Sequence, residues 1–214
     1  MSRITSRIHI AAAVSVLVTL AGSAGADPGQ PAAAAELAIG AEAPIFKLKG
    51  ADGAMHALTD YKDAKAVVVV FTCLSCPFAR AYEERTIALA KDYADRGVQV
   101  VAIMPNDPRI VPADAPDKIK ARAEEMKYPF PYLIDETQAV ATAFGAKVTP
   151  HVFLFGPDRK LAYRGRIDDE TDPTKVTTHD LKKALDQVLA AEPVATASTK
   201  AFGCTIKWKK DKAS

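Results

Sequence analysis

Two cysteines separated by two residues offer the clearest chemistry in this chain of 214 residues. Cys73 and Cys76 follow the apolar run 66–71, and a helical pattern begins directly after them at Pro77. A run of β-branched residues predicts a buried strand, so the pair lies where a strand gives way to a helix. Free backbone N–H groups and the helix dipole stabilise a thiolate at such a junction. Because the thiolate is the reactive form of cysteine, the pattern predicts redox chemistry.

A third cysteine, Cys204, lies far along the chain, close to the single tryptophan, Trp208. Unpaired cysteines are among the most buried residues, so the preferred interpretation is a buried and inert thiol. The alternative is an additional redox thiol that resolves Cys73 or Cys76 or links two chains. The apolar side chains of Ile206 and Trp208 predict that this segment docks onto the domain.

Metal binding and a static disulfide are the competing interpretations of the cysteine pair. A structural zinc site needs four ligands, and the chain has no second Cys-x-x-Cys and no His-x-x-x-His pattern. His151 would complete a set of two thiolates and an imidazole that suits copper, although the simpler interpretation is that it begins a buried strand. Cys-x-x-Cys pairs at a helix start are usually reactive rather than static. We therefore expect no metal and no cofactor besides the cysteines.

The first 26 residues have the features of a secretory signal peptide. Arg3 and Arg7 precede a short apolar stretch, residues 10–20, and residues 24–26 form an A-x-A cleavage site. An uncleaved anchor is the alternative, but the apolar stretch is short for a transmembrane helix. Cleavage would leave equal numbers of basic and acidic residues, which gives no footprint for nucleic acid. We expect an exported bacterial protein, periplasmic or secreted, without stable membrane insertion after cleavage.

The elements that must position the cysteines follow an α/β order. Residues 27–37 form a Pro/Gly/Ala-rich segment expected to be a flexible linker, residues 38–191 a single domain, and residues 192–214 a C-terminal tail. Parallel crossovers come first and an antiparallel hairpin comes last, which predicts a sheet flanked by helices. The expected strands are 45–48, 54–58, 66–71, 98–104, 132–134, 151–155 and 160–163, and the expected helices are 77–96, 117–126, 136–144 and 177–190.

Three motifs together resemble the thioredoxin fold. The run CLSCP at 73–77 is followed about 75 residues later by Val148-Thr149-Pro150 before a strand. Residues 39–46, IGAEAPIF, are similar to the opening of the redoxin branch, and residues 202–208, FGCTIKW, to the end of a bacterial peroxiredoxin-like group. Over roughly residues 38 to 209 the chain resembles the alkyl hydroperoxide reductase and thiol-specific antioxidant family.

The resemblance implies an α/β, thioredoxin-like fold of the redoxin branch with a mixed central sheet. Within it, Pro150 would be cis and would pack with Thr149 beside the sulfurs, where an extended substrate strand can pair. The resemblance assigns Cys73 as the attacking thiol and Cys76 as the resolving thiol of a redox-active disulfide. The implied function is that of an exported thiol–disulfide oxidoreductase.

Two other functions fit the same motifs. Cys76 followed by Pro77 matches the peroxidatic position of peroxiredoxins, so a thiol-dependent peroxidase is one alternative, with Cys73 as the resolving thiol. A copper-binding chaperone on the thioredoxin fold, using the two cysteines and His151, is the other. The expected partners are protein or small-molecule thiols and disulfides, with hydroperoxides under the peroxidase alternative, and an electron-donor protein that the sequence does not identify.

Overall fold

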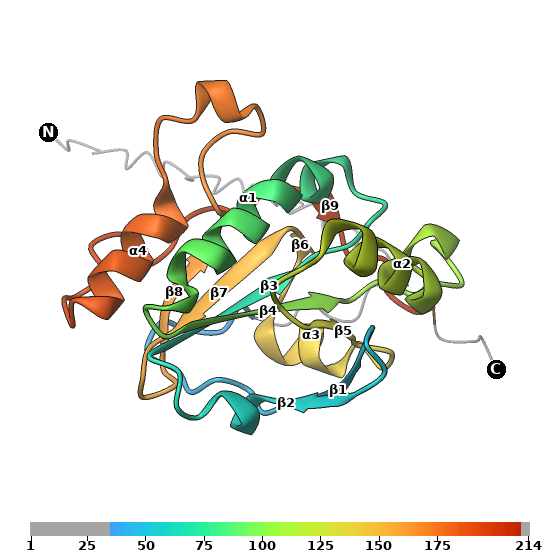
Figure 1. Ribbon diagram of the computed structural model, residues 1–214, viewed down its shortest axis with the longest axis horizontal. Helices are drawn as coiled ribbons and strands as arrows, with labels where there is room; N and C mark the ends of the chain where they lie inside the picture. Colours follow the sequence, from blue (N-terminus) through green and yellow to red (C-terminus); the bar gives the residue numbers. More distant parts are fainter. Residues whose placement is uncertain (1–34, 211–214) are drawn as a thin grey trace, which may run out of the picture.

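The computed structural model describes residues 35–210 (Figure 1). The predicted signal peptide, residues 1–26, and most of the predicted linker lie outside the described residues. Glu36 and Leu37, at the end of that linker, contact the domain: the N–H of Leu37 donates to the carbonyl oxygen of Phe144 at 3.1 Å, and Glu36 pairs with two basic side chains. Within the described part, no helix combines the length and the apolar character that a membrane crossing requires.

The described residues form nine strands: β1 Lys47–Gly50, β2 Met55–Ala57, β3 Ala66–Phe71, β4 Val98–Met104, β5 Tyr132–Ile134, β6 Val148–Thr149, β7 His151–Phe155, β8 Leu161–Gly165 and β9 Cys204–Thr205. Seven of them make one mixed sheet with the order β2-β1-β5-β4-β3-β7-β8, and β6 pairs with β9 in a separate ribbon. Strands β3, β4 and β5 are parallel, whereas β3–β7 and β7–β8 are antiparallel. The predicted α/β order is confirmed.

Helices cover both faces of this sheet. They are α1 Pro77–Ala94, α2 Pro116–Met126, α3 Ala139–Phe144 and α4 Asp180–Leu189. Helices α1, α2 and α4 pack on one face and α3 packs on the other (Figure 1). The thioredoxin-like architecture that the motifs imply is therefore present.

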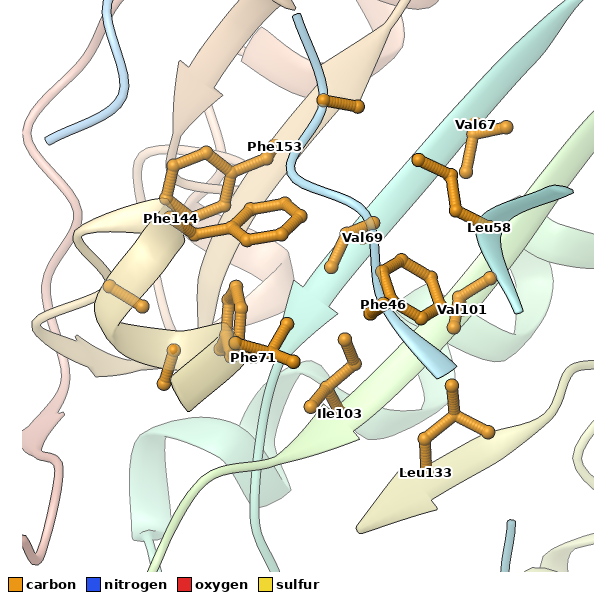
Figure 2. Close-up of a cluster of buried hydrophobic side chains, with 14 of the residues drawn as sticks. Phe46, Leu58, Val67, Val69, Phe71, Val101, Ile103, Leu133, Phe144 and Phe153 are labelled. Carbon is orange, nitrogen blue, oxygen red and sulfur yellow. The ribbon is translucent and has the colours of Figure 1, made fainter. Parts of the chain in front are cut away.

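Strand β3 is buried on both faces because its side chains alternate between the two layers. Val67, Val69 and Phe71 face the α3 side, where they belong to one buried cluster with Phe144 and Phe153 (Figure 2). The Phe71 ring lies 5.3 Å from that of Phe144 and 5.7 Å from that of Phe153, both edge to face. Each fully buried side chain of this size contributes about 1.5–3 kcal/mol. The central strand that carries the cysteines is thus firmly fixed.

Two predicted helix starts are wrong by three residues each. The third helix begins at Ala139 rather than at residue 136, because Gln138 adopts the left-handed conformation with φ 62°. The fourth begins at Asp180 rather than at residue 177. The N–H groups of Thr177 and Thr178 donate to the carboxylate of Asp169, which keeps both threonines in the preceding loop.

The segment after α4 runs back across the molecule and is docked along its length. The N–H of Thr199 donates to the carbonyl oxygen of Arg164 at 3.0 Å, beside β8. The ring of Phe202 then packs against two aromatic rings of α1, at 6.0 and 6.1 Å. After β9, Ile206 is buried and Trp208 packs against the core on the α3 side. The predicted docking of this segment is confirmed.

Candidate functional site

The cysteine pair occupies the turn between β3 and α1. The N–H of Thr72 still donates to β4, so the sheet holds the chain up to the residue before Cys73. Cys76 is the N-cap residue of α1, and its sulfur accepts the N–H of Ala79 at 3.5 Å. Pro77 occupies the first helical position, where the missing proline N–H costs nothing. A strand that ends in a capped helix start therefore fixes both sulfurs.

Thr149 connects the two sulfurs to the loop before β7. Its hydroxyl lies 3.2 Å from the Cys73 sulfur, and its carbonyl oxygen accepts the Cys76 thiol at 3.0 Å. The peptide bond between Thr149 and Pro150 is cis, as the resemblance implies. Two motifs that lie 76 residues apart in the chain are therefore in direct contact.

The two cysteines shift each other's pKa in opposite directions. The hydrogen bond from Cys73 holds the pKa of Cys76 at about 4 against the opposing effect of burial, and the N–H of Ala79 assists. The same bond, together with burial, raises the pKa of Cys73. The carbonyl of Thr149 acts in the opposite sense on Cys76, because it can accept a hydrogen only from the thiol form. These shifts favour a thiolate on Cys76 and a thiol on Cys73 at neutral pH.

A cavity opens beside one of the two cysteines. Cys73 lines it and Cys76 does not. The walls combine aliphatic and aromatic side chains with Pro150, and charged side chains of α1 lie at the rim; the aromatic members are Tyr82, Tyr128, Phe130 and Tyr132. Each cysteine is only 2% exposed, and the cavity beside Cys73 is narrow, with a volume of about 20 Å³.

Glu83 fixes the rim of the cavity. Its carboxylate accepts two hydrogen bonds from Arg122, at 2.6 and 2.9 Å, and a further one from the hydroxyl of Tyr128. These contacts tie α1 to α2 across the cavity. Arg80, which also lines the cavity, is largely exposed and lies 3.5 Å from the same carboxylate.

Asp114 is a candidate site residue that the sequence reasoning missed. Its side chain is fully buried in the short 3-10 turn Pro112–Asp114. The carboxylate accepts the N–H groups of Leu74 and Ser75 at 2.9 Å each, and the hydroxyl of Ser75 and the amide of Asn106 at 2.7 Å each. It therefore holds the two residues between the cysteines. The only sequence signal was an acid within a proline-rich connection, some 40 residues from the pair.

His151 turns away from the sulfurs. Its Nδ1 accepts the N–H of Lys147 at 3.4 Å, and its ring lies 4.5 Å from that of Phe153. Burial lowers the pKa of this imidazole to about 4. Within residues 35–210 no three His, Cys, Asp or Glu side chains are grouped to hold a metal ion. The prediction that His151 begins a buried strand is confirmed, and the geometry gives the copper interpretation no support.

Strand β9 brings Cys204 to the cysteine pair. The β6–β9 register places it opposite Thr149, and its side chain packs against the cluster that contains Cys73 and Cys76. The expectation of a buried thiol is wrong, because Cys204 is partly exposed whereas Cys73 and Cys76 are buried. All three are free thiols, so the predicted Cys73–Cys76 disulfide stays a prediction. The backbone edge of Thr149, where a substrate strand was expected, is occupied by β9.

The fold and the site together define a thioredoxin-like oxidoreductase: a mixed sheet, a Cys-x-x-Cys pair at a helix start, and a cis-proline loop beside it. Residues 39–164 match the model of the AhpC/TSA family, and the chain belongs to this family. The predicted resemblance is confirmed, and the protein is an enzyme of the oxidoreductase class.

One relative that is named as an oxidoreductase and two solved structures cover most of the chain. The thiol-disulfide oxidoreductase ResA of Geobacillus thermodenitrificans is 27% identical over 155 residues, which span 71% of this chain and 79% of that protein. A solved structure of a hypothetical protein from Sinorhizobium meliloti 1021 has a TM-score of 0.77 and 38% identity, covering 81% of this chain and 96% of that one. An uncharacterized conserved protein from Geobacillus kaustophilus has a TM-score of 0.78 and 40% identity, covering 82% and 94%.

Proposed function

We propose that the protein is an exported thiol–disulfide oxidoreductase that exchanges two electrons with a substrate disulfide through Cys73 and Cys76. The observation that carries this proposal is the contact of both sulfurs with Thr149, beside a cavity lined by Cys73. Similarity to the ResA oxidoreductase supports the same class of reaction. The largely apolar lining of the cavity favours a substrate whose disulfide is flanked by apolar groups.

In the proposed reaction, Cys73 meets the substrate because it is the sulfur that lines the cavity. Its proton passes to the Cys76 thiolate, and the Cys73 sulfur attacks one substrate sulfur. The substrate S–S bond breaks, the first thiolate leaves and takes the proton from Cys76, and a mixed disulfide remains on Cys73. Cys76 then attacks the Cys73 sulfur and releases the second substrate thiolate. The substrate gains two electrons, and the enzyme ends with a Cys73–Cys76 disulfide.

Reduction of insulin disulfides with dithiothreitol as donor tests this proposal. Cys73→Ser should reduce turnover to the rate without enzyme, whereas Cys76→Ser should accumulate a mixed disulfide that is visible on non-reducing gels. Thr205→Ser, an exposed change nearby, is the matched control and should retain full activity. Normal turnover by Cys73→Ser would overturn the assignment of the attacking sulfur.

A thiol-dependent peroxidase is the second candidate, favoured by the low pKa of Cys76 at the start of α1. Its thiolate would attack hydrogen peroxide, release hydroxide and become a sulfenic acid, and Cys73 would condense with it to form a disulfide and water. Peroxide consumption with a dithiol donor measures this activity. Consumption that disappears in Cys76→Ser would support it, and a rate no higher than that of the variant lacking both cysteines would exclude it.

Export is part of the proposal and depends on residues 1–26. The basic start, the apolar stretch and the A-x-A site support cleavage after Ala26. N-terminal sequencing of the protein from the periplasmic and cytosolic fractions of an expressing Gram-negative host tests this. We expect a periplasmic chain that begins at Asp27. A cytosolic chain that keeps residues 1–26 would contradict export.

A further inference from the structure

We propose that Cys204 is a third redox thiol, which attacks Cys76 in the oxidised Cys73–Cys76 pair and forms a Cys76–Cys204 disulfide. This inference rests on the proposed function of the pair and extends it. It converts a two-cysteine exchange into a relay of three sulfurs, running from the cavity at Cys73 through Cys76 to the partly exposed Cys204.

The three sulfurs converge on one residue. Thr149 contacts the Cys73 sulfur through its hydroxyl and the Cys76 sulfur through its carbonyl oxygen, at 3.2 and 3.0 Å. On its other side, Thr149 is paired with Cys204 in the β6–β9 register. Cys204 packs against the cluster that contains Cys73 and Cys76, and it is close enough to Cys76 to lower the pKa of that thiol.

The position of Cys204 is enforced by the segment around it. The side-chain oxygen of Asn106 accepts the N–H of Lys207 at 2.9 Å, and the side-chain amide of Gln138 donates to the carbonyl oxygen of Lys207 at 2.9 Å. The N–H of Ile206 donates to the carbonyl oxygen of Lys147 at 3.1 Å, and the Ile206 side chain is buried. These contacts anchor the residues that directly follow β9. They therefore fix the position of the Cys204 thiol near Cys76.

Gly203 permits the close approach on the other side of Cys204. A Cβ atom at this position would press on the carbonyl oxygen of Thr149, well inside van der Waals contact. Only a glycine therefore lets β9 lie flat against β6 at the point where the sulfurs meet.

The three thiols differ in exposure, and this difference places the two ends of the proposed relay at different parts of the surface. Cys73 and Cys76 are each 2% exposed, and Cys73 lines the cavity. Cys204 is partly exposed, belongs to the tail, and does not line that cavity. A second redox partner could therefore act at Cys204 while the substrate side stays at Cys73.

The proposed step is a balanced disulfide isomerisation. The Cys204 thiol loses its proton and its sulfur attacks the Cys76 sulfur. The Cys73–Cys76 bond breaks, the Cys76–Cys204 bond forms, and Cys73 leaves as a thiolate that takes up one proton. The enzyme is neither oxidised nor reduced overall, so the step needs no external oxidant or reductant.

The charge balance favours this step only after the pair is oxidised. Burial and the neighbouring Cys76 together raise the pKa of Cys204 to about 11. Once Cys76 is part of a disulfide it carries no charge, so that second contribution disappears. Lys207 lowers the pKa of Cys204 and remains in place.

Disulfide mapping by mass spectrometry tests the inference. The full mature chain, fully reduced, is treated with one equivalent of diamide, blocked with N-ethylmaleimide and digested with trypsin. Cys73 and Cys76 share the tryptic peptide 66–80, and Cys204 lies in 201–207. We expect a fraction of 66–80 linked to 201–207 with one blocked cysteine. Cys73→Ser should give this link within a single chain, and Cys76→Ser should lose it.

Controls separate the relay from an adventitious crosslink. Thr205→Ser should give the same yield as the wild type, whereas Gly203→Ala should lower it by displacing β9. Complete blocking of Cys204 in the oxidised wild type, or an equal yield in Cys76→Ser, would overturn the inference. Insulin reduction, measured on the same wild-type sample, distinguishes a failure of the proposed function from a failure of the inference about Cys204. A link without insulin reduction would refute the proposed function alone, and insulin reduction without the link would refute the third thiol alone.

Discussion

Among the single residues, Cys76 has the most unusual electrostatic environment. It lies at the first turn of α1, where the N–H of Ala79 and the neighbouring Cys73 thiol lower its pKa and so favour the thiolate. Cys73 instead faces the cavity and the hydroxyl of Thr149. Cys76 therefore carries the negative charge, whereas Cys73 is the sulfur that lines the cavity. Transfer of one proton from Cys73 to Cys76 would make Cys73 the thiolate.

This division predicts a low first pKa for the reduced pair. In the wild type, thiolate absorbance near 240 nm should appear with a midpoint around pH 4. Cys73→Ser should shift the midpoint upward, because the hydrogen bond that contributes most to the lowered pKa of Cys76 is lost. Cys76→Ser should abolish the acidic transition. Absence of thiolate absorbance at pH 6 in the wild type would contradict the low pKa of Cys76.

Asp114 provides a second prediction for a single residue. Asp114→Asn replaces one acceptor oxygen by a donor, and because each oxygen accepts two of the four hydrogen bonds, two of the four donors lose their acceptor. Hydrogen bonds to charged groups contribute about 1.5–3 kcal/mol each, and we expect a loss of this order in the free energy of unfolding, with slower disulfide exchange. Urea denaturation measures the first effect. Asp117→Asn, an exposed aspartate at the start of α2, is the matched control and should change neither quantity.

Among the elements, the ribbon of β6 and β9 decides how the tail meets the cysteines. Each strand has only two residues, and the pair is not part of the main sheet. Its stability therefore depends on Gly203, on buried Ile206 and on the hydrogen bonds to Lys207. The ribbon places a segment from the end of the chain at the edge of the cis-proline loop.

Gly203→Ala should weaken this ribbon. The added methyl group has no room beside the Thr149 carbonyl oxygen, and overpacking of this kind costs about 1–3 kcal/mol. We expect faster alkylation of Cys204 by N-ethylmaleimide in the folded, reduced protein, because local opening exposes the thiol. Gly156→Ala is the control, since its Cβ would meet only the side chain of Asp158. Equal labelling rates in both variants would show that β9 tolerates the methyl group.

For the whole molecule, acid stability depends on histidine burial. His151 is neutral in the folded chain with a pKa of about 4, whereas an unfolded chain has a histidine pKa near 6.5. Its contribution to stability is therefore complete above about pH 6.5 and is lost as the pH falls from 6.5 to 4. The difference between the two pKa values corresponds to roughly 3 kcal/mol.

His151→Gln should remove this part of the pH dependence while it keeps an acceptor for the N–H of Lys147. The free energy of unfolding, measured by urea denaturation between pH 7 and 4, should fall less steeply in the variant than in the wild type. His179→Gln serves as the control, because His179 is exposed and should leave the slope unchanged. Parallel slopes for the wild type and His151→Gln would contradict the role of the buried imidazole.

The sequence by itself determined the parts of the fold that depend on neighbouring residues. The run 66–71 specified a doubly buried strand, and Pro77 after Cys76 specified a capped helix start, so the cysteine pair could be placed without a structure. The predicted bounds of β4, β5 and β7 are correct for the same reason: each is a short apolar run that ends at polar, glycine or proline residues.

Only the tertiary structure decided which distant residues complete the site. Asp114 is 40 residues from the pair, and nothing in its local pattern marks it as the acceptor for the loop between the cysteines. Cys204 was expected to be buried, yet pairing of β9 with β6 leaves it partly exposed beside Cys76. Sequence patterns report local periodicity, whereas these contacts arise when chain folding and close packing bring separate segments together. The protonation of the two thiols depends on that packing as well, because burial and neighbouring groups set the pKa of each thiol.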